Sequence, residues 1–183
     1  DRGFDVNVGE SSTGSQSNIS YKLEGSSGNR ILKVEWNNVG FYGDVDLNGA
    51  SATNFTNFQL WLFESDNSIE IHFGPNSITD TNLAFDDLSG SSIILVEEFN
   101  LDSGILGPNG ALLLTGSPVS PSLVTVFNFN NPENNVLNGV IPNGTLYRFV
   151  PSNLSTDEFE TAQLKLFPNP SKDVIHINGL TQT

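Results

Sequence analysis

Oxygen-bearing side chains alternate along the stretch GDVDLNGAS, at Asp44, Asp46 and Asn48. Gly49 follows the last of them, as in the first half of a twelve-residue calcium loop, where oxygen ligands at positions one, three and five precede a glycine that turns the chain. The twelfth position, which supplies a bidentate glutamate in a full loop of this type, holds Phe55. The pattern predicts Ca²⁺ as a cofactor in a weak site that would rigidify the loop.

Two interpretations without a metal ion remain open for the same residues. Asp, Asn and Gly are common in turns, because the short polar side chains cap their own backbone and glycine adopts positive φ. Val45 and Leu47 alternate with the acids, which also fits a strand with a polar outer face. This stretch is not expected to take part in catalysis in any of the three interpretations.

Acid–base chemistry would have to come from two histidines and a few carboxylates, because the chain has no Cys. A Ser-His-Asp arrangement would use His72, since His176 lies in the C-terminal tail, but His72 alternates with apolar residues as an ordinary strand residue does. A glycosidase needs two facing carboxylates about 5–10 Å apart. The acids on or beside predicted strands are Glu35, Glu70, Glu97 and Glu98. We interpret them as solvated strand faces, so the chain is predicted not to be an enzyme, with a glycoside-active domain as the alternative.

Composition and charge narrow the classes of partner. The 183 residues contain 7 Lys and Arg against 21 Asp and Glu, for a formal charge of -14. Such a chain is repelled by phosphate backbones and anionic lipids, so neither nucleic acid nor a membrane surface is an expected partner. No apolar run approaches the roughly 20 residues of a membrane span. The chain lacks Met and begins with Asp1, which a cleaved secretion signal would explain.

Short apolar runs with period-two alternation predict strands along most of the chain. In ILKVEW, Leu32, Val34 and Trp36 would share one face, and residues 58–73 predict a hairpin around a polar turn. Further strands are expected in FDVNV near the start, ISYKL at 19–23, SIILVEEF at 92–99, ALLLTG at 111–116, LVTVFNF at 123–129 and TLYRFV at 145–150. Turns rich in Pro, Asn and Gly separate them. The predicted fold is all-β, an antiparallel β-sandwich of the jelly-roll or lectin-like kind.

One face of the predicted hairpin combines aromatic and polar groups. Five side chains should share this face: Gln59, Trp61, Phe63, Glu70 and His72. A Trp and a Phe beside polar groups could stack on a sugar or dock a protein, so these residues are the predicted ligand surface for an extracellular protein or glycan. Alternatively, the N-terminal strands or the loop 80–90 cover this face and make it a second core layer.

The tail LKLFPNPSKDVIHI, residues 164–177, resembles the opening of the type IX secretion sorting domain of certain gram-negative bacteria. The residues that carry the resemblance are Phe167, Pro168, Asn169, Pro170, Asp173 and Val174, then the alternating Ile175 and Ile177. Two prolines fix a turn, and the following strand is expected to pair back as a short β-hairpin. The resemblance implies the type IX machinery as a partner and a location outside the cell, either secreted or on the outer surface. The sorting domain normally runs for several more strands, so this tail is expected to be its truncated start.

The segments RILKVEWNNVGFYG and NFQLWLFESDNSIEIHFG resemble the nidogen-type extracellular module. The carrying features are Glu35 to Val39, Phe41-Tyr42-Gly43, Asn57 to Leu60, and Ile69 to Ile71 before Phe73-Gly74. The later pieces LLLTGSP and IPNGTLYRFVP are similar to the closing strands of such modules. These modules are adhesion and matrix-type units without known catalytic residues, so the resemblance implies a binding function and no active site.

Three segments are therefore expected: a β-sandwich module over residues 1–151, a linker over 152–163, and the start of a sorting domain over 164–183. The predicted function is non-catalytic adhesion or binding by a module that a gram-negative bacterium secretes or displays. The alternative is a small carbohydrate-binding or carbohydrate-active domain stabilised by calcium.

Overall fold

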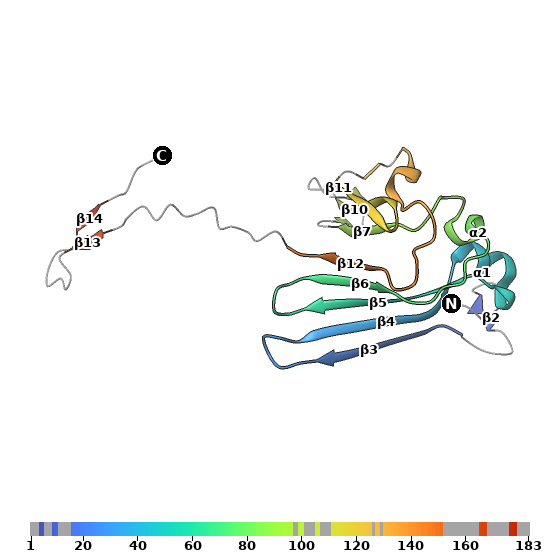
Figure 1. Cartoon of the computed structure of the whole chain (residues 1–183), viewed down its shortest axis with the longest axis horizontal. Coiled ribbons are helices and arrows are strands. Elements are labelled where there is room, and N and C mark those ends of the chain that lie inside the picture. Colours follow the sequence, from blue (N-terminus) through green and yellow to red (C-terminus); the bar gives the residue numbers. More distant parts are fainter. Residues whose placement is uncertain are drawn as a thin grey trace. The chain divides into compact units, whose positions relative to one another are not determined.

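The period-two alternation of the sequence builds antiparallel sheets in the computed structural model (Figure 1). The structure describes residues 4–5, 9–10, 16–96, 99–100, 105–106, 111–125, 127–128, 130–151, 165–167 and 176–178. The chain divides into two compact units, Asp1–Phe149 and Val150–Thr183.

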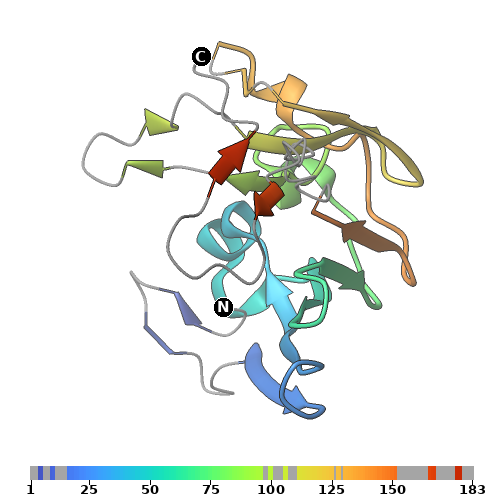
Figure 2. The same ribbon diagram turned by 90° about the vertical axis from the view of Figure 1, so that its left-hand side faces the viewer.

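The first unit contains two main sheets. The larger has the order β12-β6-β5-β4-β3, formed by β3 (Asn18–Glu24), β4 (Ile31–Gly40), β5 (Phe55–Phe63), β6 (Ile69–Phe73) and β12 (Leu146–Phe149). The smaller has the order β11-β10-β7, formed by β7 (Ile93–Val96), β10 (Ala111–Ser117) and β11 (Ser120–Val124). Figures 1 and 2 show them as separate layers, and the predicted all-β sandwich is confirmed.

Short elements complete this unit. Two further pairs of strands are β1 (Phe4–Asp5) with β2 (Gly9–Glu10), and β8 (Phe99–Asn100) with β9 (Ile105–Leu106). The helical segments are α1 (Tyr42–Asn48), η1 (Gly49–Ser51), α2 (Thr81–Phe85) and η2 (Pro132–Asn135). None of the helices that the structure describes is long and apolar enough to cross a membrane.

The core lies between the inner faces of the two main sheets. Leu114 of the smaller sheet clusters with Leu137, Ile141 and Tyr147, and Phe73 and Phe149 of the larger sheet pack against them. The Tyr147 hydroxyl donates a hydrogen bond of 2.7 Å to the Pro118 carbonyl in the β10–β11 turn, and burial raises the pKa of Tyr147. This bond joins the two layers through a group that would otherwise be buried without a partner.

A row of aromatic rings crosses the inner face of the larger sheet. Trp36 stacks on Phe58 with 5.0 Å between ring centroids, Phe58 lies 6.1 Å from Phe73, and Phe73 meets Tyr147 edge-on at 5.8 Å. Because these rings come from β4, β5, β6 and β12 in turn, cross-strand packing fixes the register of four strands. Beyond the row, at the β3 end, the same face is exposed at Ile19, Tyr21 and Leu23.

The two segments that resemble the nidogen-type module meet at a β-bulge. The β4–β5 register shifts between Trp36 and Val39, and Asn38 adopts a positive φ of 56°. The Asn38 N–H donates to the side-chain oxygen of Asn57 at 2.6 Å. Asn57 of β5 therefore supplies an acceptor for this N–H group at the point where the β-ladder is interrupted. The residue types at 38 and 57 thus follow from the geometry of the bulge.

Two expectations about local structure are wrong. Residues 42–48 form a helix, neither a turn nor a strand. The strand expected over 123–129 is instead β11, because the hairpin closes at Pro118-Val119 and pairs Ser117 with Ser120. Pro121 lies in this strand, where an edge position tolerates a residue without an N–H.

The second unit contains one described strand pair. β13 (Lys165–Phe167) pairs antiparallel with β14 (His176–Asn178), and Phe167 lies opposite His176. The tail therefore pairs back on itself as expected from its sequence. The other sorting-motif residues, Pro168, Asn169, Pro170 and Asp173, lie outside the described residues.

Candidate functional site

The outer face of the larger sheet, opposite the aromatic row, gathers the predicted ligand-surface residues. Cross-strand pairing sets Gln59 opposite His72 and Trp61 opposite Glu70. Phe63 follows Trp61 at the period-two spacing, with 6.4 Å between their ring centroids. The hairpin thus places all five predicted residues on one face, and their role in ligand binding stays a prediction.

Trp61 stands at the centre of this outer face, half-buried by its neighbours. The Lys33 ammonium of β4 lies 3.9 Å from the indole centroid, and the His72 ring of β6 lies 4.2 Å from it. The indole N–H donates to the Gln59 side-chain oxygen at 2.8 Å. Since β4 and β6 flank β5 on opposite sides, the two neighbours occupy the two faces of the indole, and its edge is what remains for a ligand.

A second group of contacts surrounds Glu70, which is only 8% exposed. Its carboxylate lies 2.8 Å from the His72 Nε2 and 3.6 Å from the Arg148 guanidinium. Arg148 also pairs with Asp66 at 2.9 Å and lies 5.7 Å from the Phe63 ring. The guanidinium is therefore held between two acids and an aromatic ring, an arrangement that keeps its planar fork ordered.

The β3 side of the outer face carries the remaining cations of these strands. Glu24 accepts hydrogen bonds from Lys22 and Lys33, each at 2.6 Å, and these contacts lower the pKa of Glu24 to about 2. Of the four Lys and Arg residues whose side chains the structure describes, three lie on this face and Arg30 lies beside it, in the β3–β4 turn. Each of the three cations on the outer face is thus paired with an acid, although the chain as a whole is strongly acidic.

A shallow polar cavity of about 370 Å³ opens beside His72. Its polar lining comes from β4 and β5 as well as β6: Glu35, Asn37, Asn57, Gln59 and His72. The Gln59 amide donates to Glu35 at 2.8 Å, which fixes the orientation of both groups. A ligand with several hydroxyl groups would meet acceptors and donors here.

The structure adds two residues that the sequence did not single out, Lys33 and Arg148. Lys33 was within reach of sequence reasoning, because it alternates with Leu32 and Val34 and must point to the outer face. Arg148 was not, since its place depends on the pairing of β12 with β6, and no local pattern reveals a contact such as that of Arg148 with Asp66, 82 positions apart.

Asp44, the first predicted calcium ligand, is buried at 1% exposure. One carboxylate oxygen accepts from the Asn48 amide at 2.8 Å; the other accepts from the Thr53 and Asn54 backbone N–H groups, at 3.1 and 2.7 Å, and from the Asn54 amide at 2.8 Å. Burial raises the pKa of Asp44, but these hydrogen bonds outweigh burial and the net pKa is lowered. Four N–H donors satisfy this carboxylate.

The other predicted ligands do not converge with Asp44 as a calcium loop requires. Asp46 is exposed two positions further along α1, and the Asn48 amide donates to Asp44 through its nitrogen. Among the residues that the structure describes, no three His, Asp or Glu side chains are grouped as metal ligands. Calcium binding stays a prediction that this geometry does not favour.

The carboxylates considered for glycoside chemistry are also separated. Glu35 and Glu70 flank β5 on different strands and pair with residues two positions apart, which places their Cα atoms roughly 12 Å apart. Each is engaged by a neighbour, Gln59 or His72, whereas Glu97 and Glu98 lie outside the described residues. Both described acids are therefore held by side chains of the same sheet face, and a glycoside-active domain stays an alternative prediction.

Comparison with known proteins identifies the family of the chain. A family model described as NIDO related matches residues 5–151. Searches of the curated proteins and of the solved structures found no match. The match covers most of the chain, and the chain therefore belongs to the NIDO-related family, a nidogen-like module type that is extracellular and non-enzymatic.

Proposed function

We propose that this chain is an adhesion module that binds an extracellular protein through the outer face of its larger sheet. The observation that carries the proposal is the composition of that face, where Trp61 and Arg148 sit among paired charges in a chain of net charge -14. Trp and Arg are the residues that most often dominate the energy of protein interfaces. Both are held in place by neighbours here, which lowers the entropy lost on docking.

The packing around Trp61 favours a protein over a sugar as the main ligand. A sugar ring stacks on a free aromatic face, but Lys33 and His72 occupy the two faces of the indole. A protein can instead contact the indole edge and exchange partners with the surrounding ion pairs. Of the two predicted uses of this face, sugar stacking is therefore less favoured than protein docking.

A glycan is retained as a second candidate because of the polar cavity beside His72. Amide, carboxylate and imidazole groups converge there within a volume of about 370 Å³, and such groups hydrogen-bond sugar hydroxyls. This mode of binding would use Glu35, Asn57 and Gln59 without stacking on Trp61.

The test is an array that carries purified secreted and cell-surface proteins beside a set of glycans. We expect the wild type to bind at least one protein, and Trp61→Ala to weaken that binding at least about tenfold. Tyr42→Ala is the matched control, because Tyr42 is an exposed aromatic residue (78%) on α1, outside the larger sheet, and should leave affinity unchanged. Retained binding by Trp61→Ala would contradict the proposal, as would a wild type that binds no protein; binding to glycans alone would favour the second candidate.

For export, we infer a type IX route from the resemblance of the tail to a sorting domain. The antiparallel pairing of β13 with β14 supports this inference, since the sorting resemblance requires two strands that pair around the proline turn. Replacing Pro168 and Pro170 by Ala in the full-length protein of its own bacterium should reduce the secreted or surface-bound fraction. Unchanged export of this variant would contradict the inferred route.

A further inference from the structure

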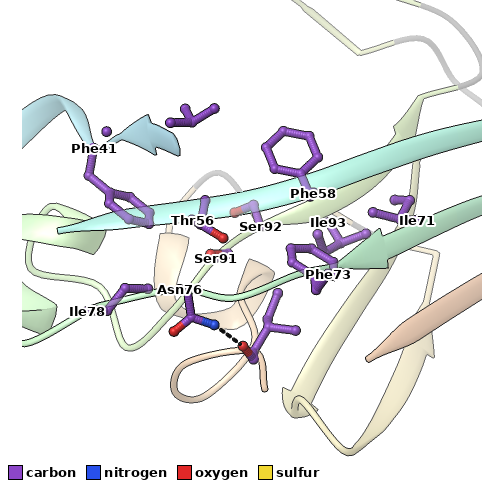
Figure 3. A pocket seen from close by; sticks show the side chains of 13 residues that line it. Phe41, Thr56, Phe58, Ile71, Phe73, Asn76, Ile78, Ser91, Ser92 and Ile93 are labelled. Carbon is purple, nitrogen blue, oxygen red and sulfur yellow. Dashed lines mark hydrogen bonds between the residues drawn. The ribbon is translucent and has the colours of Figure 1, made fainter. Parts of the chain in front are cut away.

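A second cavity, of about 380 Å³, lies between the two main sheets at the edge of the core. Phe58 and Phe73 of the larger sheet and Ile93 of the smaller sheet line it (Figure 3). Phe41 and Ile78 line it as well. The space continues from the packed core, because Phe73 and Ile93 also pack against the buried cluster.

The lining is apolar except for a few neutral polar groups. Thr56 comes from β5, and Ser91 and Ser92 directly precede β7. Among the described residues, none forms a hydrogen bond with the hydroxyl of Thr56, Ser91 or Ser92. Asn76 is anchored by its amide nitrogen, which donates to the Ile141 carbonyl at 2.9 Å (Figure 3). The three hydroxyl groups of the wall are therefore free to orient a ligand.

The lining also excludes charged ligands. None of the thirteen residues around the cavity carries a charge, and the chain as a whole is strongly acidic. An anionic head group would lose its hydration without finding a counter-charge, and a cationic one would find no acid in the cavity. A neutral molecule is the class that this wall accepts.

We propose that this cavity binds a small neutral molecule with an apolar body and one hydroxyl or carbonyl group. Ligand pockets typically enclose about 300–1,000 Å³, lined mostly by apolar side chains with a few placed polar groups. An apolar cavity of about 150 Å³ takes up benzene, so the present volume fits a ligand of roughly ten to fifteen non-hydrogen atoms. The apolar body contacts Phe58, Phe73 and Ile93, and the head group hydrogen-bonds with the Thr56 hydroxyl.

The proposal is tested with 1-octanol and octanoate, which share an apolar chain and differ in the charge of the head group. Calorimetric titration of the full chain should show saturable 1:1 binding of 1-octanol and at least about tenfold weaker binding of octanoate. In isoleucine-methyl NMR spectra, the shifted signals should be those of residues lining the cavity, Ile71, Ile78, Ile93 and Ile141. No saturable binding, equal binding of both probes, or shifts confined to other isoleucines would overturn the proposal.

Two variants test the cavity site independently of the outer face of the larger sheet. Ser91→Phe should fill the cavity and abolish 1-octanol binding, whereas Ser65→Phe, in the exposed β5–β6 turn, makes the same change elsewhere and should leave binding intact. Thr56→Val keeps the shape of the side chain but removes the hydroxyl, and should weaken 1-octanol binding about threefold to tenfold. It serves as the decisive variant if Ser91→Phe does not fold. Wild-type affinity in a folded Ser91→Phe, or in Thr56→Val with Ser91→Phe unfolded, would contradict the assigned site.

Discussion

Asp44 and Glu70 are the two buried carboxylates among the side chains that the structure describes, and they have different kinds of partner. Asp44 accepts four hydrogen bonds from backbone and amide N–H groups. Glu70 meets the ionisable side chains of His72 and Arg148, which are 30% and 47% exposed. One acid is fixed by the fold itself, and the other belongs to a surface whose members can exchange partners.

The partners of each acid show what it does. Asp44 ties α1 to the start of β5, and its partner Asn54 accepts from the Thr79 and Asp80 N–H groups before α2. Through these bonds one carboxylate holds three segments together. Glu70 instead orients two side chains that a ligand can reach. Burial alone would have assigned both acids the same role.

The largest effect is expected from Asp44→Asn. The variant keeps the shape but replaces one acceptor oxygen by a donor, so that buried N–H groups lose their partner, and we expect the free energy of unfolding to fall by about 3 kcal/mol. Denaturant unfolding measures this change. Asp46→Asn, on the exposed side of α1, is the control and should stay within about 0.5 kcal/mol of the wild type. Equal, small losses in both variants would show that Asp44 does not hold these segments together.

Glu70→Gln should cost less stability but change the outer face. Its partners are partly exposed and can be resolvated, so we expect a loss of about 1 kcal/mol in the free energy of unfolding. His72 and Arg148 lose the acid that orients them. The affinity of the variant for any array protein that the wild type binds should therefore fall as well. A large loss of stability with unchanged affinity would reverse the roles assigned to Glu70 and Asp44.

Acid should reveal the contribution of Asp44. Its pKa is lowered in the folded state from the ordinary value of 3.8, so the unfolded chain binds the proton more readily. The stabilisation is therefore complete above about pH 3.8 and is lost as the pH falls through the folded pKa. Between pH 5 and pH 2, the free energy of unfolding should decline less steeply with falling pH in Asp44→Asn than in the wild type. Identical slopes would contradict the lowered pKa.

Calcium should have the smallest effect. With both Asp44 oxygens engaged by N–H donors, millimolar calcium is expected to leave the melting temperature equal to that in chelator. A reproducible rise with calcium that Asp44→Asn and Asp46→Asn both remove would restore the metal site predicted from the sequence.

Glu70 and Asp44 show which features of the structure could be predicted from the sequence. Alternation placed Glu70 correctly on the polar face of the β5–β6 hairpin, because a local turn fixes that register. Its burial under Arg148 could not be anticipated, since β12 joins the sheet only through long-range pairing. For Asp44, the alternation of Val45 and Leu47 indicated a strand, yet tertiary contacts impose a helix of seven residues that has no side-chain cap at its start.

The outer face of the larger sheet is the proposed binding surface of this module. The most direct measurement is an NMR titration of the protein with the partner identified on the array, following the Trp61 indole N–H and the Arg148 guanidinium signals. Both signals should shift on binding, together with those of Gln59 and His72. Unchanged signals from this face, with shifts confined to the smaller sheet, would contradict the proposed surface.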